Sequence, residues 1–66
     1  MSIVKVIEVI ASSDKGWDHA AAEAVENASK TIKNIKHFYV ESQTAIVDDG
    51  KITEYRINGK ISFVVD

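Results

Sequence analysis

The stretch Ile46-Val47-Asp48-Asp49-Gly50-Lys51-Ile52-Thr53 decides the fold of this chain of 66 residues. Asp-Gly between two β-branched runs is a strong hairpin signal, because a two-residue type I′ turn needs positive φ at both central positions. The flanking composition predicts strands over Lys36–Val47 and Ile52–Val65. A two-residue loop then predicts four cross-strand pairs: Phe38 with Ile61, Val40 with Gly59, Ser42 with Ile57 and Thr44 with Tyr55.

This pairing gives the predicted hairpin one apolar and one polar face. The four pairs form the apolar face, which a helix should cover, and Gly59 would let that helix approach closely. The polar face has no second layer, which favours its burial against other subunits or a ligand. It carries His37, Tyr39, Glu41 and Gln43, paired with Ser62, Lys60, Asn58 and Arg56.

The N-terminal half predicts a strand followed by a helix. Ile3–Ile10 is rich in β-branched residues, which is typical of a strand. A stripe with three-four spacing predicts a helix that runs to about Ile35, with Asn34 as a left-handed terminator. The stripe consists of Trp17, Ala21, Ala24, Val25, Ala28, Ile32 and Ile35. The helix cap is expected at Ser12, Ser13 or Asp14.

These elements predict an α+β fold of order β-α-β-β, in which one helix packs on one face of a three-stranded antiparallel sheet. The third strand lies between or beside the first two and runs antiparallel to both. The whole chain, residues 1–66, is expected to form a single domain.

Composition favours an oligomer over a lone subunit. A chain this short buries only about 60% of its unfolded surface, so small domains rely on disulfides, metals or oligomerisation. The sequence has no cysteine and only two histidines, which leaves oligomerisation. Its net charge of −2 does not suit a nucleic-acid binder. The apolar runs are too short for a bilayer and no secretory signal pattern is present, so we expect a cytoplasmic protein without membrane contact.

The chain resembles the dodecins over nearly its whole length. The similarity rests on a series of short segments in the same order and spacing. They are Val6–Ile10, Ser12–Gly16, Ala20-Ala21, Ala24, Ala28–Ile32, Phe38, Val40, Glu54-Tyr55 and Phe63. The resemblance implies a β-α-β-β subunit in a hollow homododecamer. It also implies a protein that binds flavins or related small molecules for storage, buffering or scavenging and is not an enzyme.

Three positions depart from the flavin-binding pattern of that family. His37 stands where flavin-binding dodecins carry the tryptophan that stacks on the isoalloxazine ring. Arg56 stands where they carry a glutamine that hydrogen-bonds the edge of the ring, and Tyr39 replaces a common acidic residue. Imidazole offers a smaller π face than indole, whereas a guanidinium suits phosphate or carboxylate. Flavin binding therefore does not transfer automatically.

Together with His37 and Arg56, the resemblance implies a particle that sequesters a flavin, with riboflavin or flavin mononucleotide (FMN) as candidates, or another anionic aromatic ligand. The expected ligand-binding residues are His37, Arg56, Tyr39 and Gln43. The alternative is a dodecin-fold assembly that does not bind flavin and acts as a structural or ion-binding particle. An enzyme is disfavoured because no nucleophile elbow or phosphate loop is visible, and no dedicated metal site is expected.

Four further features have two interpretations each. Trp17 is either a displaced stacking residue or a packing anchor, and the second is favoured. His19 and Glu23, four residues apart, could share a metal but more often form a surface pair. Asp48-Asp49-Gly50 could be part of a calcium loop, although the turn explains it better. Arg56 could contact a ligand or pair with one of two acids, Glu41 or Glu54.

Overall fold

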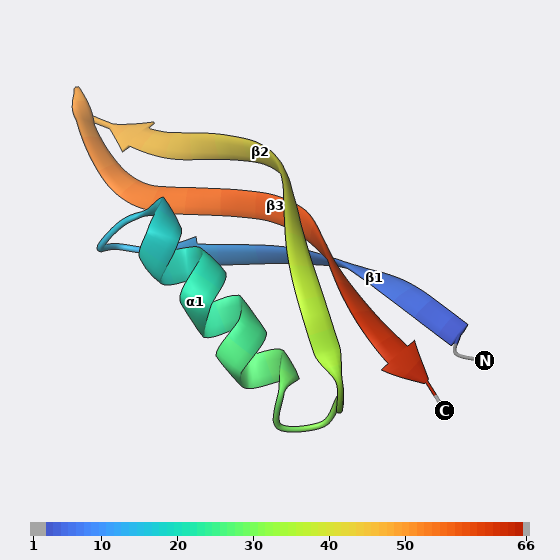
Figure 1. The fold of residues 1–66 in the computed structure, drawn as a ribbon. Helices are drawn as coiled ribbons and strands as arrows, with labels where there is room; N and C mark the ends of the chain where they lie inside the picture. The colour runs from blue at the N-terminus through green and yellow to red at the C-terminus, as the bar shows by residue number, and fades with distance from the viewer. Residues whose placement is uncertain (1–2, 66) are drawn as a thin grey trace.

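The structure, a computed structural model, describes residues 3–65. It contains β1 (Ile3–Ser13), α1 (Trp17–Ala28), β2 (Ile35–Asp48) and β3 (Lys51–Val65) (Figure 1). The three strands form one antiparallel sheet in the order β1-β3-β2, and α1 packs on one face of it. The predicted β-α-β-β fold is therefore confirmed, and the third strand lies between the other two.

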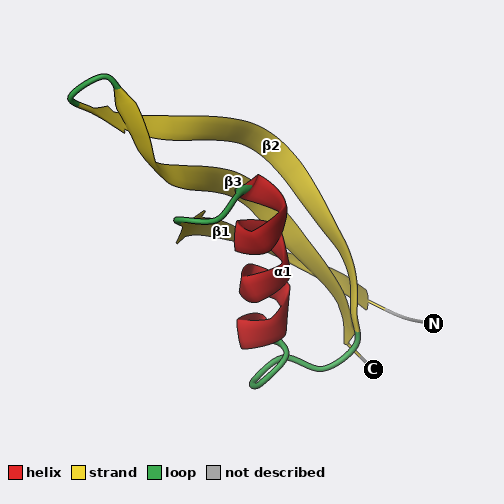
Figure 2. Ribbon diagram, turned by 90° about the vertical axis from the view of Figure 1, so that its left-hand side faces the viewer, coloured by secondary structure: helices red, strands yellow, loops and turns green. Residues whose placement is uncertain are grey.

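The sheet is strongly curved and holds α1 on its concave side (Figure 2). Buried apolar side chains are few in residues 3–65: Ala20 of the helix, and Ile57 and Ile61 of β3. The small alanine side chains of α1 allow the helix to lie close to the central strand.

Gly59 serves a different purpose from the expected one. A side chain at this position would collide with the ring of Phe38 and with the backbone carbonyl of Tyr39. The ring of Phe38 therefore crosses the space above Gly59, and a neighbouring strand, not the helix, requires the glycine.

The isolated subunit is extended and exposes much surface. Its radius of gyration is 13.6 Å, whereas a compact chain of this length has about 11 Å. Its accessible surface is 4891 Å², against about 4,200 Å² for a compact monomer of this mass. Among residues 3–65, no helix has the length and apolar character needed to cross a bilayer.

The helix is shorter than predicted. It begins after Gly16, which makes no side-chain cap, and the expected cap candidate Ser13 remains the last residue of β1. It ends at Ala28, because the following amides of Lys30 and Thr31 bond three residues back in a tighter turn.

The stripe residues beyond that turn do not continue the helix. Ile32 lies outside α1 and Ile35 begins β2. Asn34 has the expected left-handed conformation, with φ of 63°, but it precedes a strand and does not terminate the helix.

The hairpin turn and part of its register are as predicted. Asp49 and Gly50 have φ of 52° and 74°, as a type I′ turn requires. The expected partners of Phe38 and Val40 are confirmed.

The predicted pairs of Ser42 and Thr44 are wrong, because two bulges shift the middle of the hairpin by one residue. Ser42 faces Asn58 and Thr44 faces Arg56. The extra residues are Thr53 in β3, between the partners of Ile46 and Val47, and Glu41 in β2. Since one extra residue lies in each strand, the two shifts cancel, and the predicted register returns at the turn and from Val40 back to His37; a third shift, at Lys36, displaces the pair of Ile35 and Phe63.

Candidate functional site

The sheet face opposite α1, here named the open face, is the candidate site. Its members follow from strand alternation and from the cross-strand register, since directly paired residues point to the same side. They are Val4, Val6, Glu8, Ile10 and Ser12 of β1, His37, Tyr39, Glu41, Ser42, Thr44 and Ile46 of β2, and Glu54, Arg56, Asn58, Lys60, Ser62 and Val64 of β3.

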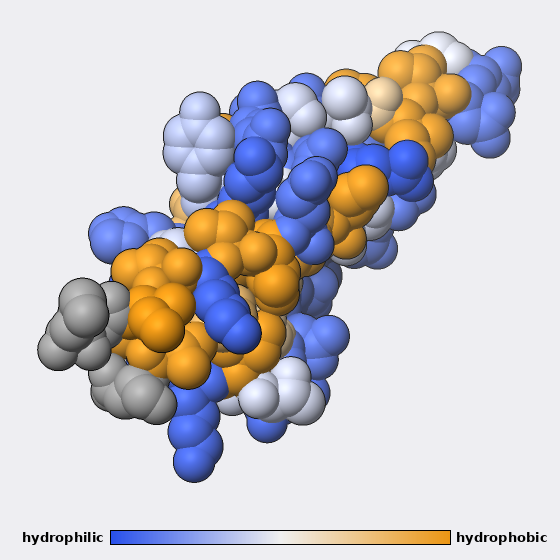
Figure 3. All heavy atoms as spheres, turned by 90° about the vertical axis from the view of Figure 1, so that its right-hand side faces the viewer, coloured by the Kyte–Doolittle hydropathy of each residue, from blue (hydrophilic) through white to orange (hydrophobic). Residues whose placement is uncertain are grey.

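The open face is mixed in character. From His37 to Thr44 of β2 and from Arg56 to Ser62 of β3 its members are polar or amphipathic, whereas Val4, Val6 and Ile10 of β1 are exposed apolar side chains. Figure 3 shows apolar surface gathered at the end of the molecule where the termini lie. A ligand or neighbour that covers this face would therefore meet both apolar and hydrogen-bonding groups.

His37 and Tyr39 lie on the open face at the start of β2, as expected. Both are exposed. The ring Nδ1 of His37 lies 3.4 Å from the hydroxyl of Ser62, its partner on β3. Tyr39 is opposite Lys60 and makes no side-chain hydrogen bond within residues 3–65.

Arg56 lies on the open face towards the hairpin end. Its Nε donates a hydrogen bond of 3.3 Å to the hydroxyl of Ser12 on β1. Sequence reasoning did not find Ser12 as a partner, because it placed Ser12 after the first strand as a candidate helix cap, whereas β1 continues to Ser13.

Gln43 does not lie beside Arg56 as predicted. The bulge at Glu41 pairs Gln43 with Ile57, whose side chain faces the helix. Gln43 therefore belongs to the opposite side of the sheet from His37, Tyr39 and Arg56. The bulge brings Thr44 to the position opposite Arg56 instead.

Glu41, one of the two acids considered as partners of Arg56, contacts a different cation. A carboxylate oxygen of Glu41 lies 3.4 Å from Nζ of Lys60. Glu8 is opposite Lys60 on the other neighbouring strand. Within residues 3–65, neither Glu41 nor Glu54 forms an ion pair with Arg56.

One subunit does not bring His37 and Arg56 together. His37 is paired with Ser62, which is six positions from Arg56 along β3 (62 minus 56). At about 3.4 Å per residue, the two positions are roughly 20 Å apart. A small ligand that contacts both kinds of residue would have to lie between copies of the chain.

Trp17 is a packing residue in this subunit. Its ring meets that of Tyr55 edge-on, with centroids 5.0 Å apart and an angle of 82° between the planes. Its Nε1 donates a hydrogen bond of 2.8 Å to the carbonyl of Thr44. These contacts agree with the favoured interpretation of Trp17 as an anchor.

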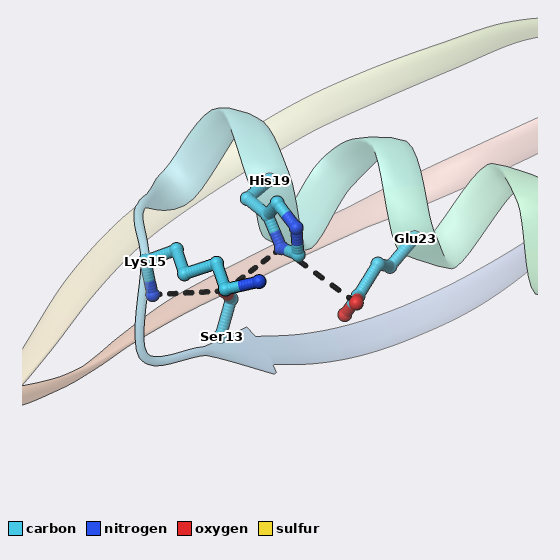
Figure 4. A network of polar contacts seen from close by, with 4 residues as sticks. All are labelled: Ser13, Lys15, His19 and Glu23. Atoms are coloured by element: carbon cyan, nitrogen blue, oxygen red, sulfur yellow. Dashed lines mark hydrogen bonds and ion pairs between the residues drawn. The ribbon is translucent and has the colours of Figure 1, made fainter.

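A polar network joins the end of β1 to the helix (Figure 4). The hydroxyl of Ser13 lies 3.0 Å from Nδ1 of His19 and accepts a hydrogen bond from the amide of Lys15. Glu23 also approaches Nδ1 of His19, at 3.6 Å. A Ser-His-acid triad needs the hydroxyl and the carboxylate on different ring nitrogens. Here both converge on the same one, so the network connects β1 to α1 and does not form a triad.

The acidic residues of one subunit do not assemble a metal site. Among residues 3–65, no group of three or more His, Asp or Glu side chains is placed to hold a metal ion. Asp48 and Asp49 lie at the type I′ turn, where the backbone conformation explains them.

Element order, the curved sheet and its open face define a class of small β-α-β-β proteins with one helix and one uncovered sheet face. A family model described as Dodecin matches residues 3–66. The chain belongs to the dodecin family.

Three known proteins illustrate the relationship. The chain is 45% identical over 64 residues to calcium dodecin from Mycobacterium tuberculosis, covering 96% of this chain and 89% of that protein. A crystal structure of that calcium dodecin, described as having a novel calcium-binding site, superposes with a TM-score of 0.84 at 36% identity, covering 97% of this chain and 91% of the other. Dodecin from Streptomyces coelicolor superposes with a TM-score of 0.92 at 28% identity, covering 98% and 93%.

Proposed function

We propose that this chain is one subunit of a hollow homo-oligomer, a homododecamer, which binds and stores a small ligand and catalyses no reaction. The main support for an oligomer is the large accessible surface of the isolated subunit. The isolated subunit exposes 4891 Å², several hundred Å² more than a compact monomer of its mass. Part of the excess is apolar: Val4, Val6 and Ile10 on the open face are 61%, 54% and 66% exposed. Exposed apolar surface of this kind favours burial between copies.

Mass measurement tests the assembly. Light scattering of purified protein at micromolar concentration should give a mass near twelve subunits of 7.3 kDa. An absorbance spectrum of the untreated preparation would at the same time detect a co-purified chromophore. A stable monomer in dilute solution would contradict the proposal.

The ligand that best suits the open face is an anionic aromatic molecule, such as FMN. Tyr39 and His37 supply flat surfaces at one end, and Arg56 supplies a cation at the other. Because these ends are roughly 20 Å apart in one chain, copies of the chain would have to complete the site together. Titration with riboflavin and FMN, followed by fluorescence quenching, tests this choice. An absence of quenching at micromolar protein would exclude flavins as the ligand.

A cation is the second candidate ligand. Its support is the 45% identity to a protein named calcium dodecin and the net charge of −2 per chain. The donor set of one subunit does not fit calcium, which takes six to eight oxygen ligands, because residues 3–65 contain no group of three acidic or histidine side chains that could hold it. A calcium site would therefore need ligands from several copies. Calorimetric titration of chelator-treated particles with CaCl₂ and MgCl₂ tests this alternative.

A further inference from the structure

Arg56 is a cation without an acidic partner in the described part of the chain. It is the single arginine of the sequence, and it is exposed on the open face. The bulge at Glu41 lets that carboxylate approach Lys60, so the nearby negative charge is committed to another cation. Within residues 3–65, Arg56 takes part in no ion pair. Its charge is therefore available to an anion.

Two hydroxyl groups flank the guanidinium, one on each neighbouring strand. Ser12 of β1 and Thr44 of β2 are the direct cross-strand partners of Arg56. We name these three residues the hydroxyl–arginine row. The row contains one cation and two hydroxyl groups and no carboxylate.

Two hydrogen bonds orient the guanidinium and the backbone of the row before any ligand arrives. The hydroxyl oxygen of Ser12 accepts the hydrogen bond from Nε of Arg56, so its own O–H proton remains free to be donated. The carbonyl of Thr44 is held by the indole of Trp17 at 2.8 Å, which fixes β2 at this point. The four N–H groups on the two Nη atoms of Arg56 are not used by Ser12. A donor set that is already oriented loses less entropy on binding.

We propose that the hydroxyl–arginine row is a phosphate-binding subsite, and that this chain selects phosphorylated over unphosphorylated forms of an otherwise identical aromatic ligand. A carboxylate would be satisfied by the guanidinium fork alone, whereas the three terminal oxygens of a phosphate monoester can use the fork and both hydroxyls. This inference rests on the proposed function of the open face in ligand binding, and it names the ligand class.

The two flavins provide a direct test, because riboflavin and FMN share one ring system and differ by a phosphate. Fluorescence quenching with the full-length particle should give at least tenfold tighter binding of FMN. Arg56→Gln should remove this preference, so that the affinities for FMN and riboflavin come within about twofold of each other. Arg56→Lys should keep part of the preference, because the charge remains but the fork is lost. Ser12→Ala should lower FMN affinity by a smaller factor.

Lys60 provides a matched control. It is a cation on the same face, but it is paired with Glu41. Lys60→Gln should leave the FMN preference unchanged. Equal losses in Lys60→Gln and Arg56→Gln would mean that general electrostatics attract the ligand, and the proposed subsite would be wrong. All variants are compared only where circular dichroism and light scattering match the unchanged protein.

A titration with pyrophosphate separates the subsite from the choice of flavin. Calorimetry should detect binding that Arg56→Gln abolishes. If pyrophosphate binds in this way but neither flavin binds, the subsite is supported and flavin is the wrong ring system. If neither pyrophosphate nor FMN depends on Arg56, or if the unchanged protein binds riboflavin as tightly as FMN, the subsite is refuted.

Discussion

The indole of Trp17 and the backbone carbonyl of Thr44 are joined by a hydrogen bond of 2.8 Å, although the residues are 27 positions apart. This bond connects the first residue of α1 to β2. The same indole packs edge-on against Tyr55 of β3. Since Gly16 provides no side-chain cap, Trp17 links the beginning of the helix to β2, while the contact of Ser13 with His19 links it to β1.

Replacing Trp17 should separate its hydrogen bond from its packing. Trp17→Phe removes only the donor and should lower the free energy of unfolding by about 1 kcal/mol. Trp17→Ala also removes the ring and should cost about 3 kcal/mol. Urea denaturation at a fixed protein concentration, followed by circular dichroism, measures both. Tyr39→Phe, at an exposed position, is the control. Equal losses for the two Trp17 variants would show that the hydrogen bond carries the whole effect.

Gly59→Ala should be strongly destabilising, because its methyl group would meet the Phe38 ring and the Tyr39 carbonyl. We expect a loss of about 2–3 kcal/mol, as for overpacking in a core, seen as a lower melting temperature. Adding Phe38→Leu should recover only part of the loss, since the backbone carbonyl remains. A Gly59→Ala protein as stable as the unchanged one would contradict the close approach.

The two bulges predict an unusual pattern of deletions. Removing either Glu41 or Thr53 leaves the other extra residue uncompensated, so one end of the hairpin must shift its faces. Each single deletion should cost more than about 3 kcal/mol. Deleting both should be less harmful than either alone, because the register is restored. Thermal melts of the three variants test this order, and additive losses would count against compensation.

The exposed apolar residues of β1 should contribute to assembly. Val6→Asp places a charge on the open face, and sedimentation velocity should show smaller species at micromolar concentration. Ala22→Asp, at an exposed position of α1, is the matched control and should leave the sedimentation coefficient unchanged. If both variants sediment like the unchanged protein, β1 is not part of the interface.

His37→Trp tests the stacking position. The larger π face should tighten the binding of riboflavin and of FMN about tenfold, in line with the roughly 1.5 kcal/mol available to a good aromatic pair. Ser42→Trp is the control, because it lies on the same face about 13 Å away along the sheet. No change in affinity for His37→Trp would remove His37 from the ligand site.

The sequence predicted the fold well where turn residues and β-branched residues give clear local signals. Asp49-Gly50 predicted its turn, and β-branched runs predicted all three strands. The end of α1 was missed, because an apolar stripe with helical spacing continues through Ile32 although the helix ends at Ala28. Periodicity alone does not detect where the backbone hydrogen bonds change from four to three residues back.

The candidate site was only partly predictable. The positions of His37, Tyr39 and Arg56 followed from strand alternation, because the predicted register holds from His37 to Val40 and β3 alternates without interruption from Tyr55 to Val65. Gln43 was assigned to the wrong face, because nothing in the composition around Glu41 and Thr53 announces an extra residue. The partnership of Arg56 with Ser12 needed the true length of β1.

Glu41 displaces the pairing of this hairpin by one residue, and Thr53 on the other strand reverses that displacement. Between them, each residue of β2 is paired with a partner displaced by one position, and the predicted pairing returns at the turn and from Val40 to His37. Only paired insertions or losses, one residue in each strand, would therefore change which groups the middle of the sheet presents while keeping the pairing at the turn and from Val40 to His37. The segment from Ser42 to Ile46 is thus the part of β2 whose cross-strand partners can change while the pairing on either side of it is kept.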